Sequence, residues 1–146
     1  MSRVARMQPV QNVVDKAEQQ RAEQLAAGER RVAECEARLA DLMKYEADYR
    51  NHYKQRVSAG MNSLQLRDYQ AFLARLTEAV RQQAQLVHNA KAERDACRKR
   101  WQEAARRAKA VEHVVDKWQA EERRGLDRRE QRDSDERAQR APVKHE

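Results

Sequence analysis

Turn-forming residues are scarce in this chain. Its 146 residues include only three Gly and two Pro, the residues that most often reverse a chain. A compact core is built from several elements that converge through turns, so this scarcity argues against a globular fold. Ala, Glu, Arg, Gln, Lys and Leu dominate instead, and these residues have the lowest free-energy cost in a helix. The composition is typical of a long helix or a coiled coil.

Long apolar runs are also missing. No stretch approaches the roughly 20 consecutive apolar residues that a membrane-spanning helix needs. The basic start of the chain, Arg3 to Arg6, is not followed by the apolar core of a secretory signal peptide. The two cysteines, Cys35 and Cys97, form no CxxC motif and fit a reducing compartment. We therefore expect a cytoplasmic protein.

Little in the sequence could support catalysis. A phosphate-binding loop needs more glycines than the chain offers. The four histidines, His52, His88, His113 and His145, are scattered without the spacing of metal ligands. The carboxylates lie among Arg and Lys on expected helix faces, where nothing encloses them to shift their pKa values. We predict that the protein is not an enzyme and uses no cofactor, metal or small-molecule substrate.

One cluster of turn formers, Ser58 to Ser63, separates two periodic segments. Gly60 can adopt the left-handed conformation that ends a helix. Asn62 together with Gln65, or Ser63 itself, can cap the free amides of the next helix. Because the loop is short, the two helices are predicted to be antiparallel neighbours.

The predicted fold is all-α: a single coiled-coil domain over residues 1–146, folded as a two-helix antiparallel hairpin. We expect the first helix at about 10–58, the loop at 59–63 and the second helix at about 64–125. Pro9 and Pro142 mark where helix is least expected. The segment beyond about Glu121 carries almost no apolar stripe, so it is expected to be a solvated extension that frays towards Pro142.

Apolar residues after the loop recur at alternating steps of three and four, the heptad pattern of a coiled coil. This predicted seam consists of Leu66, Tyr69, Leu73, Leu76, Val80, Gln83, Val87, Ala90, Arg94, Cys97, Trp101, Ala104, Ala108, Val111, Val115 and Trp118. The pattern before the loop is looser. It consists of Val14, Leu25, Val32, Cys35, Leu39, Leu42, Tyr49 and Tyr53, interrupted by Arg21, Gly28 and Glu46. Folding at the loop pairs positions whose numbers add to about 121, which holds the two cysteines more than about 10 Å apart, too far for a disulfide.

The apolar residues near the loop exceed what one seam requires. The register pairs Leu42 with Ala79, Tyr45 with Leu76, and Tyr49 with Phe72, so these residues converge on one side. Because a two-stranded coiled coil buries only a narrow seam, Tyr45 and Phe72 are expected to stay partly exposed. A patch of exposed aromatic residues indicates a binding surface. The alternative is that these side chains widen the core where the helices diverge at the loop.

The charge of the chain allows several partners. The formal net charge of +7 suits an acidic protein, a membrane surface or nucleic acid, and selects none of them. The segment from Arg98 to Lys109 is basic and contains Trp101, which could stack on bases. However, Trp101 falls on the seam register, which favours packing, and no nucleic acid is expected as a partner.

Two runs of residues carry a family resemblance. The run Arg38 to Arg50 (RLADLMKYEADYR) resembles the first-helix signature of the FliJ family of flagellar type III export proteins. The run Leu66 to Leu73 (LRDYQAFL), continued by Leu76, Ala79-Val80 and Gln82-Gln83, resembles that family's second-helix signature. Trp101 and the segment 135–138 fit more weakly. The order and spacing of these motifs carry the resemblance over nearly the whole chain.

The resemblance implies a component of the bacterial flagellar export apparatus, peripherally associated with the inner membrane at the flagellar base. In that family the hairpin is similar to the gamma-subunit stalk of rotary ATPases. Its terminal end enters the pore of the hexameric export ATPase FliI, and its surface near the loop binds the cytoplasmic domain of the export gate protein FlhA. The ATPase regulator FliH and the export chaperones that the family escorts are further implied partners.

The resemblance also implies site residues. The gate-binding positions of the family match Leu42, Tyr45, Tyr49, Phe72, Leu76 and Ala79. Two edge positions depart from the family pattern, because Arg38 replaces Gln and Gln83 replaces His.

The distribution of charge suggests contacts at the other end of the hairpin. Arg106, Arg107, Arg123 and Arg124 are candidate contacts to an acidic ATPase pore. Three alternatives remain open: the equivalent stalk of a virulence injectisome, a basic coiled coil that binds nucleic acid, and a purely structural coiled-coil dimer. Binding that collapses with salt and is not accompanied by ATPase stimulation would indicate the nucleic-acid alternative.

Overall fold

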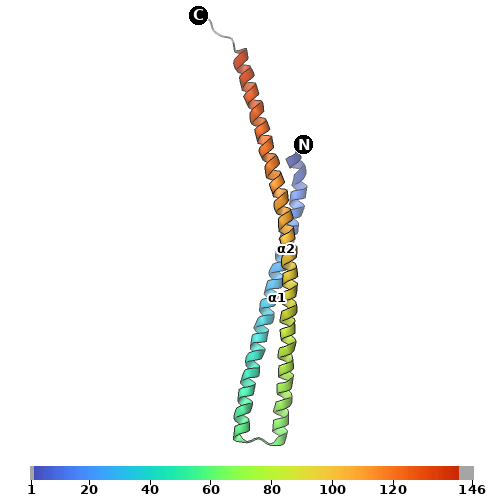
Figure 1. Cartoon of the computed structure of the whole chain (residues 1–146), viewed down its shortest axis with the longest axis vertical. Helices are drawn as coiled ribbons and strands as arrows, with labels where there is room; N and C mark the ends of the chain where they lie inside the picture. Colours follow the sequence, from blue (N-terminus) through green and yellow to red (C-terminus); the bar gives the residue numbers. More distant parts are fainter. Residues whose placement is uncertain (1, 142–146) are drawn as a thin grey trace. The chain divides into compact units, whose positions relative to one another are not determined.

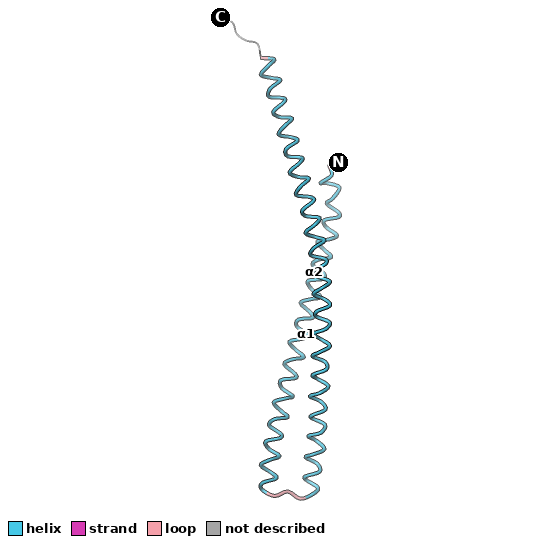
Figure 2. The backbone as a smooth tube through the Cα atoms, in the orientation of Figure 1, coloured by secondary structure: helices cyan, strands magenta, loops and turns pink. Residues whose placement is uncertain are grey.

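The computed structural model describes residues 2–141, which form two α-helices. Helix α1 spans Arg3–Ala59 and helix α2 spans Ser63–Arg140. The two helices pack against each other and are joined by the loop 60–62 (Figure 1). The described residues contain helix and loop but no strand (Figure 2). The predicted all-α helical hairpin is confirmed.

The loop between the helices uses the residues that the sequence indicated. Gly60 has a φ of 96°, in the left-handed region that favours glycine, and its N–H donates to the carbonyl of Val57 at 3.2 Å. The Asn62 side-chain oxygen accepts from the Gln65 N–H at 2.8 Å, and the Gln65 side-chain oxygen accepts from the Asn62 N–H at 3.4 Å. This reciprocal pair satisfies amides that would otherwise lack partners at the start of α2.

Helix α1 begins at Arg3, earlier than the boundary near residue 10 that Pro9 suggested. The Ser2 hydroxyl accepts from the Ala5 N–H at 3.1 Å and so caps the first turn. Pro9 lies inside the helix, where it removes one hydrogen bond to the preceding turn. The first turn is also held to α2, because the Arg3 guanidinium donates to the Glu121 carboxylate at 2.8 Å.

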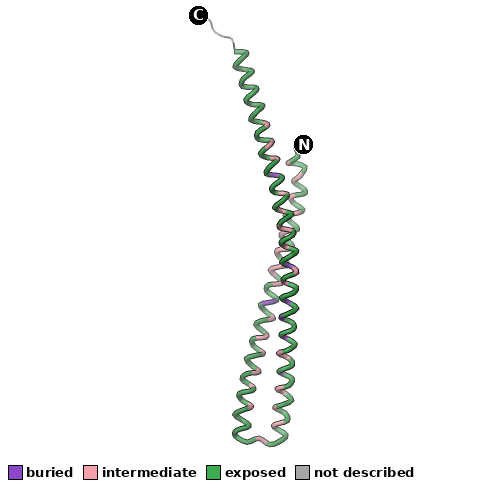
Figure 3. Tube along the Cα trace, viewed as in Figure 1, coloured by how far each residue is buried: buried purple, intermediate pink, exposed green. Residues whose placement is uncertain are grey.

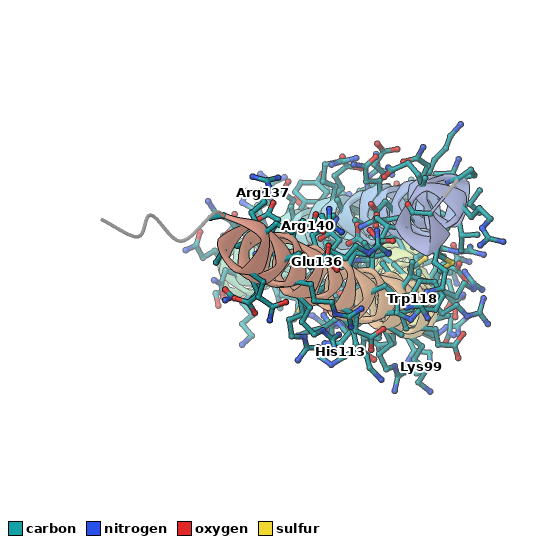
Figure 4. The ribbon with its side chains drawn as sticks, turned by 90° about the horizontal axis from the view of Figure 1, so that it is seen from above. Lys99, His113, Trp118, Glu136, Arg137 and Arg140 are labelled. Carbon is teal, nitrogen blue, oxygen red and sulfur yellow. The ribbon has the colours of Figure 1, made fainter. Side chains whose placement is uncertain are left out.

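Helix α2 continues to Arg140, beyond the expected boundary near residue 125. From residue 122 onward, every described residue except Gly125 is exposed. Glu136, Arg137 and Arg140 project outward from the last turns (Figure 4). This exposure agrees with the solvated extension predicted from the sequence, whereas the predicted fraying towards Pro142 lies outside the described residues.

The chain divides into two compact units, and each unit contains parts of both helices. Unit 2 comprises residues 20–101. The described part of unit 1 comprises residues 2–19 and 102–141. The single domain predicted from the sequence remains a prediction.

The seam of unit 2 follows the predicted register. All predicted seam residues between Leu66 and Trp101 are buried or half-buried, and the most buried include Val87 at 7 % and Ala90 at 5 % exposure (Figure 3). Across the seam, a Cβ added at Gly28 would lie 3.4 Å from the Cα of Arg94. The seam of α1 in unit 2 has the same alternating three-four spacing as that of α2. Arg21, Gly28 and Glu46, which interrupt the apolar pattern, occupy seam positions themselves. The seam residues of α1 in this unit are Arg21, Leu25, Gly28, Val32, Cys35, Leu39, Leu42, Glu46, Tyr49 and Tyr53.

The seam of unit 1 is thinner. Its members are Val4, Met7, Gln11, Val14 and Glu18 of α1 with Ala104, Ala108, Val111, Val115 and Trp118 of α2. Only Val115, at 5 % exposure, is buried among them. At its end the guanidinium carbon of Arg3 lies 4.7 Å from the centroid of the Trp118 ring, a cation–π contact that supplements the small apolar area.

Candidate partner-binding surface

An aromatic cluster lies next to the loop in unit 2. It consists of Tyr45, Tyr49, His52 and Tyr53 of α1 with Tyr69 and Phe72 of α2. Apart from the adjacent pair His52 and Tyr53, neighbouring members on each helix are three or four positions apart, so each set lies along one side of its helix. The ring centroids of Tyr49 and Phe72 are 4.6 Å apart, and Tyr45 meets Phe72 edge-on at 6.3 Å. These contacts order the rings from both helices into one surface.

The exposure of the side chains increases from the seam beneath the cluster to its outer edge. Leu76, a seam residue four positions after Phe72, is only 6 % exposed. Tyr49 and Phe72 are half-buried, and Tyr45 is 51 % exposed. The expectation that Tyr45 and Phe72 stay partly exposed is confirmed. Leu42 and Ala79, the other two gate-binding positions implied by the resemblance, are also half-buried.

The two edge positions differ in accessibility. Arg38 is exposed. Gln83 is only 6 % exposed, and its side-chain Nε2 donates to the carbonyl of Cys35 at 3.0 Å. A polar contact from Gln83 to a partner would break this bond across the seam. Gln83 therefore acts in the structure as a seam residue and not as part of an accessible edge.

Sequence reasoning missed one member of the cluster. His52 lies with its ring centroid 6.1 Å from that of Tyr69, and it is exposed. It follows Tyr45 by seven residues, a spacing that returns to the same face of a coiled-coil helix. That spacing was the available signal for its place beside the patch.

The close packing of the cluster changes the pKa of the Tyr49 phenol. Desolvation raises the pKa of Tyr49 above its ordinary value of 10.0, and the nearby Tyr69, Tyr45 and Asp68 raise it further. A group whose folded pKa is raised stabilises the fold fully below the unfolded pKa, and this contribution is lost as the pH rises through the folded pKa. The stability of the hairpin is therefore expected to fall above about pH 10.

We expect this alkaline loss of stability to shrink when Tyr49 is replaced by Phe, because phenylalanine keeps the ring and removes the titrating hydroxyl. Urea denaturation followed by circular dichroism between pH 8 and pH 11 measures the effect. Tyr53→Phe is the matched control, since Tyr53 is another half-buried tyrosine of the same aromatic cluster. Equal pH dependence in wild type and Tyr49→Phe would contradict the prediction.

The candidate ATPase contacts lie on α2 in unit 1. Arg106, Arg107, Arg123 and Arg124 are all exposed. None of them forms an ion pair with another described residue. No ion pair therefore has to be broken before these guanidinium groups meet an acidic surface.

Other kinds of site are not indicated by the part of the chain that the structure describes. Within residues 2–141, no group of His, Cys, Asp and Glu could hold a metal ion, and no helix is long and apolar enough to cross a membrane. Cys35 and Cys97 are both free thiols, as the predicted register required.

Comparison with known proteins identifies one family. A family model described as "Flagellar FliJ protein" matches residues 2–146. The match includes both helices, the loop and all of the candidate contacts described above. No curated protein and no solved structure matches the chain.

Proposed function

Because this chain belongs to the flagellar FliJ protein family, a family of flagellar export components, we propose that it connects the export ATPase to the export gate. The surface next to the loop binds the cytoplasmic domain of the gate protein FlhA. The terminal part of the hairpin binds in the pore of the FliI hexamer and stimulates ATP hydrolysis. The chain also contacts the regulator FliH, escorts export chaperones, and works at the periphery of the inner membrane.

The single observation that carries this proposal is the aromatic cluster. A two-helix seam needs only a narrow apolar stripe, yet Tyr45 adds a ring that remains 51 % exposed. Half-exposed aromatic side chains above a packed floor are typical of the energetically dominant centre of a protein interface. A coiled coil that served only as a spacer would gain nothing from exposing them.

Charge supports a different partner for the terminal part. The exposed arginines of α2 in unit 1 are unpaired, whereas the aromatic cluster is mainly apolar. An acidic pore would attract the arginines, and a surface with an apolar centre would cover the cluster. Two chemically distinct surfaces on one chain suit a protein that connects the export ATPase to the export gate.

The test is a binding assay with both partners. Purified chain is mixed separately with FliI and with the cytoplasmic domain of FlhA, and wild type is compared with Tyr45→Ala plus Phe72→Ala. We expect gate binding to weaken by about tenfold or more, because aromatic side chains at interface centres dominate affinity. Binding to FliI is expected to stay unchanged.

The matched control is Met43→Ala plus Leu64→Ala. These two apolar side chains are 55 % and 69 % exposed and lie outside the cluster, so their removal is expected to leave both partners bound. Circular dichroism checks that each variant remains helical. Unchanged gate binding in Tyr45→Ala plus Phe72→Ala would refute the gate assignment, and loss of both partners would point to unfolding.

A further inference from the structure

The two sides of the unit 2 seam differ in how their charges are neutralised. One side, here called the ion-pair side, is closed by polar contacts between the helices. Glu36 pairs with Lys91 at 3.1 Å, and Glu29 pairs with Arg98 at 3.9 Å. Further towards the loop, the Arg50 guanidinium donates to the Thr77 hydroxyl at 3.3 Å. The two ion pairs neutralise the charges of Glu29, Glu36, Lys91 and Arg98, which flank the seam on this side.

The opposite side, here called the groove side, carries a different set of residues. Arg31, Arg38 and Tyr45 of α1 are seven apart, and so are Phe72, Ala79, Leu86, Glu93 and Arg100 of α2. Residues seven apart return to the same face of a coiled-coil helix. In an antiparallel pair these two rows flank the same edge of the seam. The exposed part of the aromatic cluster therefore belongs to the groove side.

A shallow groove follows this side away from the cluster. Its first part is lined by Arg31, Glu34, Cys35, Arg38, Gln83 and Leu86. Its second part shares Arg31 and Glu34 with the first and adds Arg21, Arg30 and Arg100. The two parts therefore adjoin each other along α1.

The guanidinium groups in the groove are mostly unneutralised. Arg30, Arg31 and Arg38 form no ion pair with any described residue, and Arg21 donates only to the neutral Gln24 side chain. Arg100 alone is paired, with Glu93 at 3.6 Å. The ion-pair side of the same two helices has its charges neutralised. The excess positive charge is therefore specific to the groove side.

The floor of the groove is fixed and offers an apolar contact. The buried Gln83 side chain bonds to the Cys35 carbonyl at 3.0 Å and so ties the two helices together beneath the groove. Leu86 is 47 % exposed within it, beside Arg31 and Arg38. A ligand that binds here meets one aliphatic side chain flanked by two free guanidinium groups.

We propose that this groove binds an acidic segment of a partner protein. The segment places carboxylates on Arg31 and Arg38 and an aliphatic side chain on Leu86. Charge complementarity favours an acidic ligand, and the planar guanidinium matches carboxylate geometry. Glu34 and Glu93 also line the groove. A peptide can place uncharged residues opposite these two carboxylates, whereas a nucleic acid carries a phosphate at every nucleotide, so a peptide fits the groove better. Arg38 is also an edge position of the proposed gate-binding surface, so the groove adjoins that surface, and a peptide ligand tests the groove separately from the gate protein.

The test uses the full chain and a synthetic peptide of about 16 residues that is rich in glutamate and carries one central leucine. Titration of the ¹⁵N-labelled chain is followed through the backbone amides and the arginine side-chain N–H signals. We expect saturable shifts at Arg31, Arg38 and Leu86. Arg31→Gln plus Arg38→Gln is expected to weaken binding about tenfold, because two charge-assisted contacts are lost.

Matched controls separate a groove from general attraction to a basic protein. Arg106→Gln plus Arg107→Gln removes the same charge elsewhere and is expected to change the Kd by less than about twofold. The proposal is overturned if this control weakens binding as much as the groove variant, or if shifts spread evenly over all arginines. If a peptide with alanine in place of leucine binds with the same affinity as the leucine peptide, Leu86 makes no contact with the ligand and that part of the proposal is wrong. Tighter binding of a short DNA duplex at the same residues would assign the groove to nucleic acid instead.

Discussion

Replacing Arg106, Arg107, Arg123 and Arg124 together with glutamine is expected to weaken the proposed stimulation of FliI by this chain. All four side chains are exposed and lack ion pairs within the described residues, so their charge is available to an acidic pore. Glutamine has a helix propensity close to that of arginine, and the helix is expected to remain intact. We expect the concentration for half-maximal stimulation to rise by about tenfold or more, since charge pairs across an interface steer and hold the partners.

The measurement is the ATPase rate of FliI as a function of chain concentration at low and physiological salt. Wild-type stimulation is expected to weaken with salt, because surface charges are screened, and the glutamine variant is expected to lose that dependence. The matched control replaces Lys54, Arg56, Arg67 and Arg75 with glutamine, which removes the same charge from exposed positions in unit 2. If the control and the quadruple variant behave alike, or if the variant stimulates normally, the terminal arginines are not the ATPase contacts.

Replacing Glu46 with leucine is expected to stabilise the hairpin. Glu46 occupies a seam position in α1, and its side chain is 19 % exposed. One carboxylate oxygen accepts from Arg50 at 3.1 Å, but the other is buried without a hydrogen-bond partner. A buried carboxylate oxygen without a partner is costly, whereas leucine would extend the apolar seam. We expect a gain of about 1–2 kcal/mol in the free energy of unfolding.

Thermal and urea denaturation followed by circular dichroism measure this gain. For a protein of this length, each kcal/mol corresponds to roughly 2–4 °C in Tm. Glu46→Gln, which removes the charge but keeps the polar atoms, is expected to give a smaller change. The matched control Glu78→Leu alters a side chain that is 50 % exposed and is expected to change stability by less than about 0.5 kcal/mol. A less stable Glu46→Leu would mean that the contact with Arg50 outweighs the buried, unpartnered oxygen.

The patch that supports the gate proposal could be largely anticipated from the sequence. Tyr49 occupies a heptad position and Tyr45 and Phe72 stand beside heptad positions, so their convergence follows once the register is known. The exposure of Tyr45 followed from the narrowness of a two-helix seam. The heptad register also placed Gln83 in the seam, but it did not show which group would satisfy the buried amide. That group is the carbonyl of Cys35 on the other helix, and a polar side chain in a seam needs such a partner.

The sequence by itself determined the hairpin. Scarce turn formers, one glycine-containing loop, a reciprocal cap and an alternating three-four repeat are local properties, and each acts within a few residues of the chain. Only the tertiary structure decided how the two sides of the seam differ. Whether Glu36 meets Lys91 while Arg31 and Arg38 meet no carboxylate depends on which residues face one another across the seam. Small steps in register change all of those pairings, so a single helix cannot specify them.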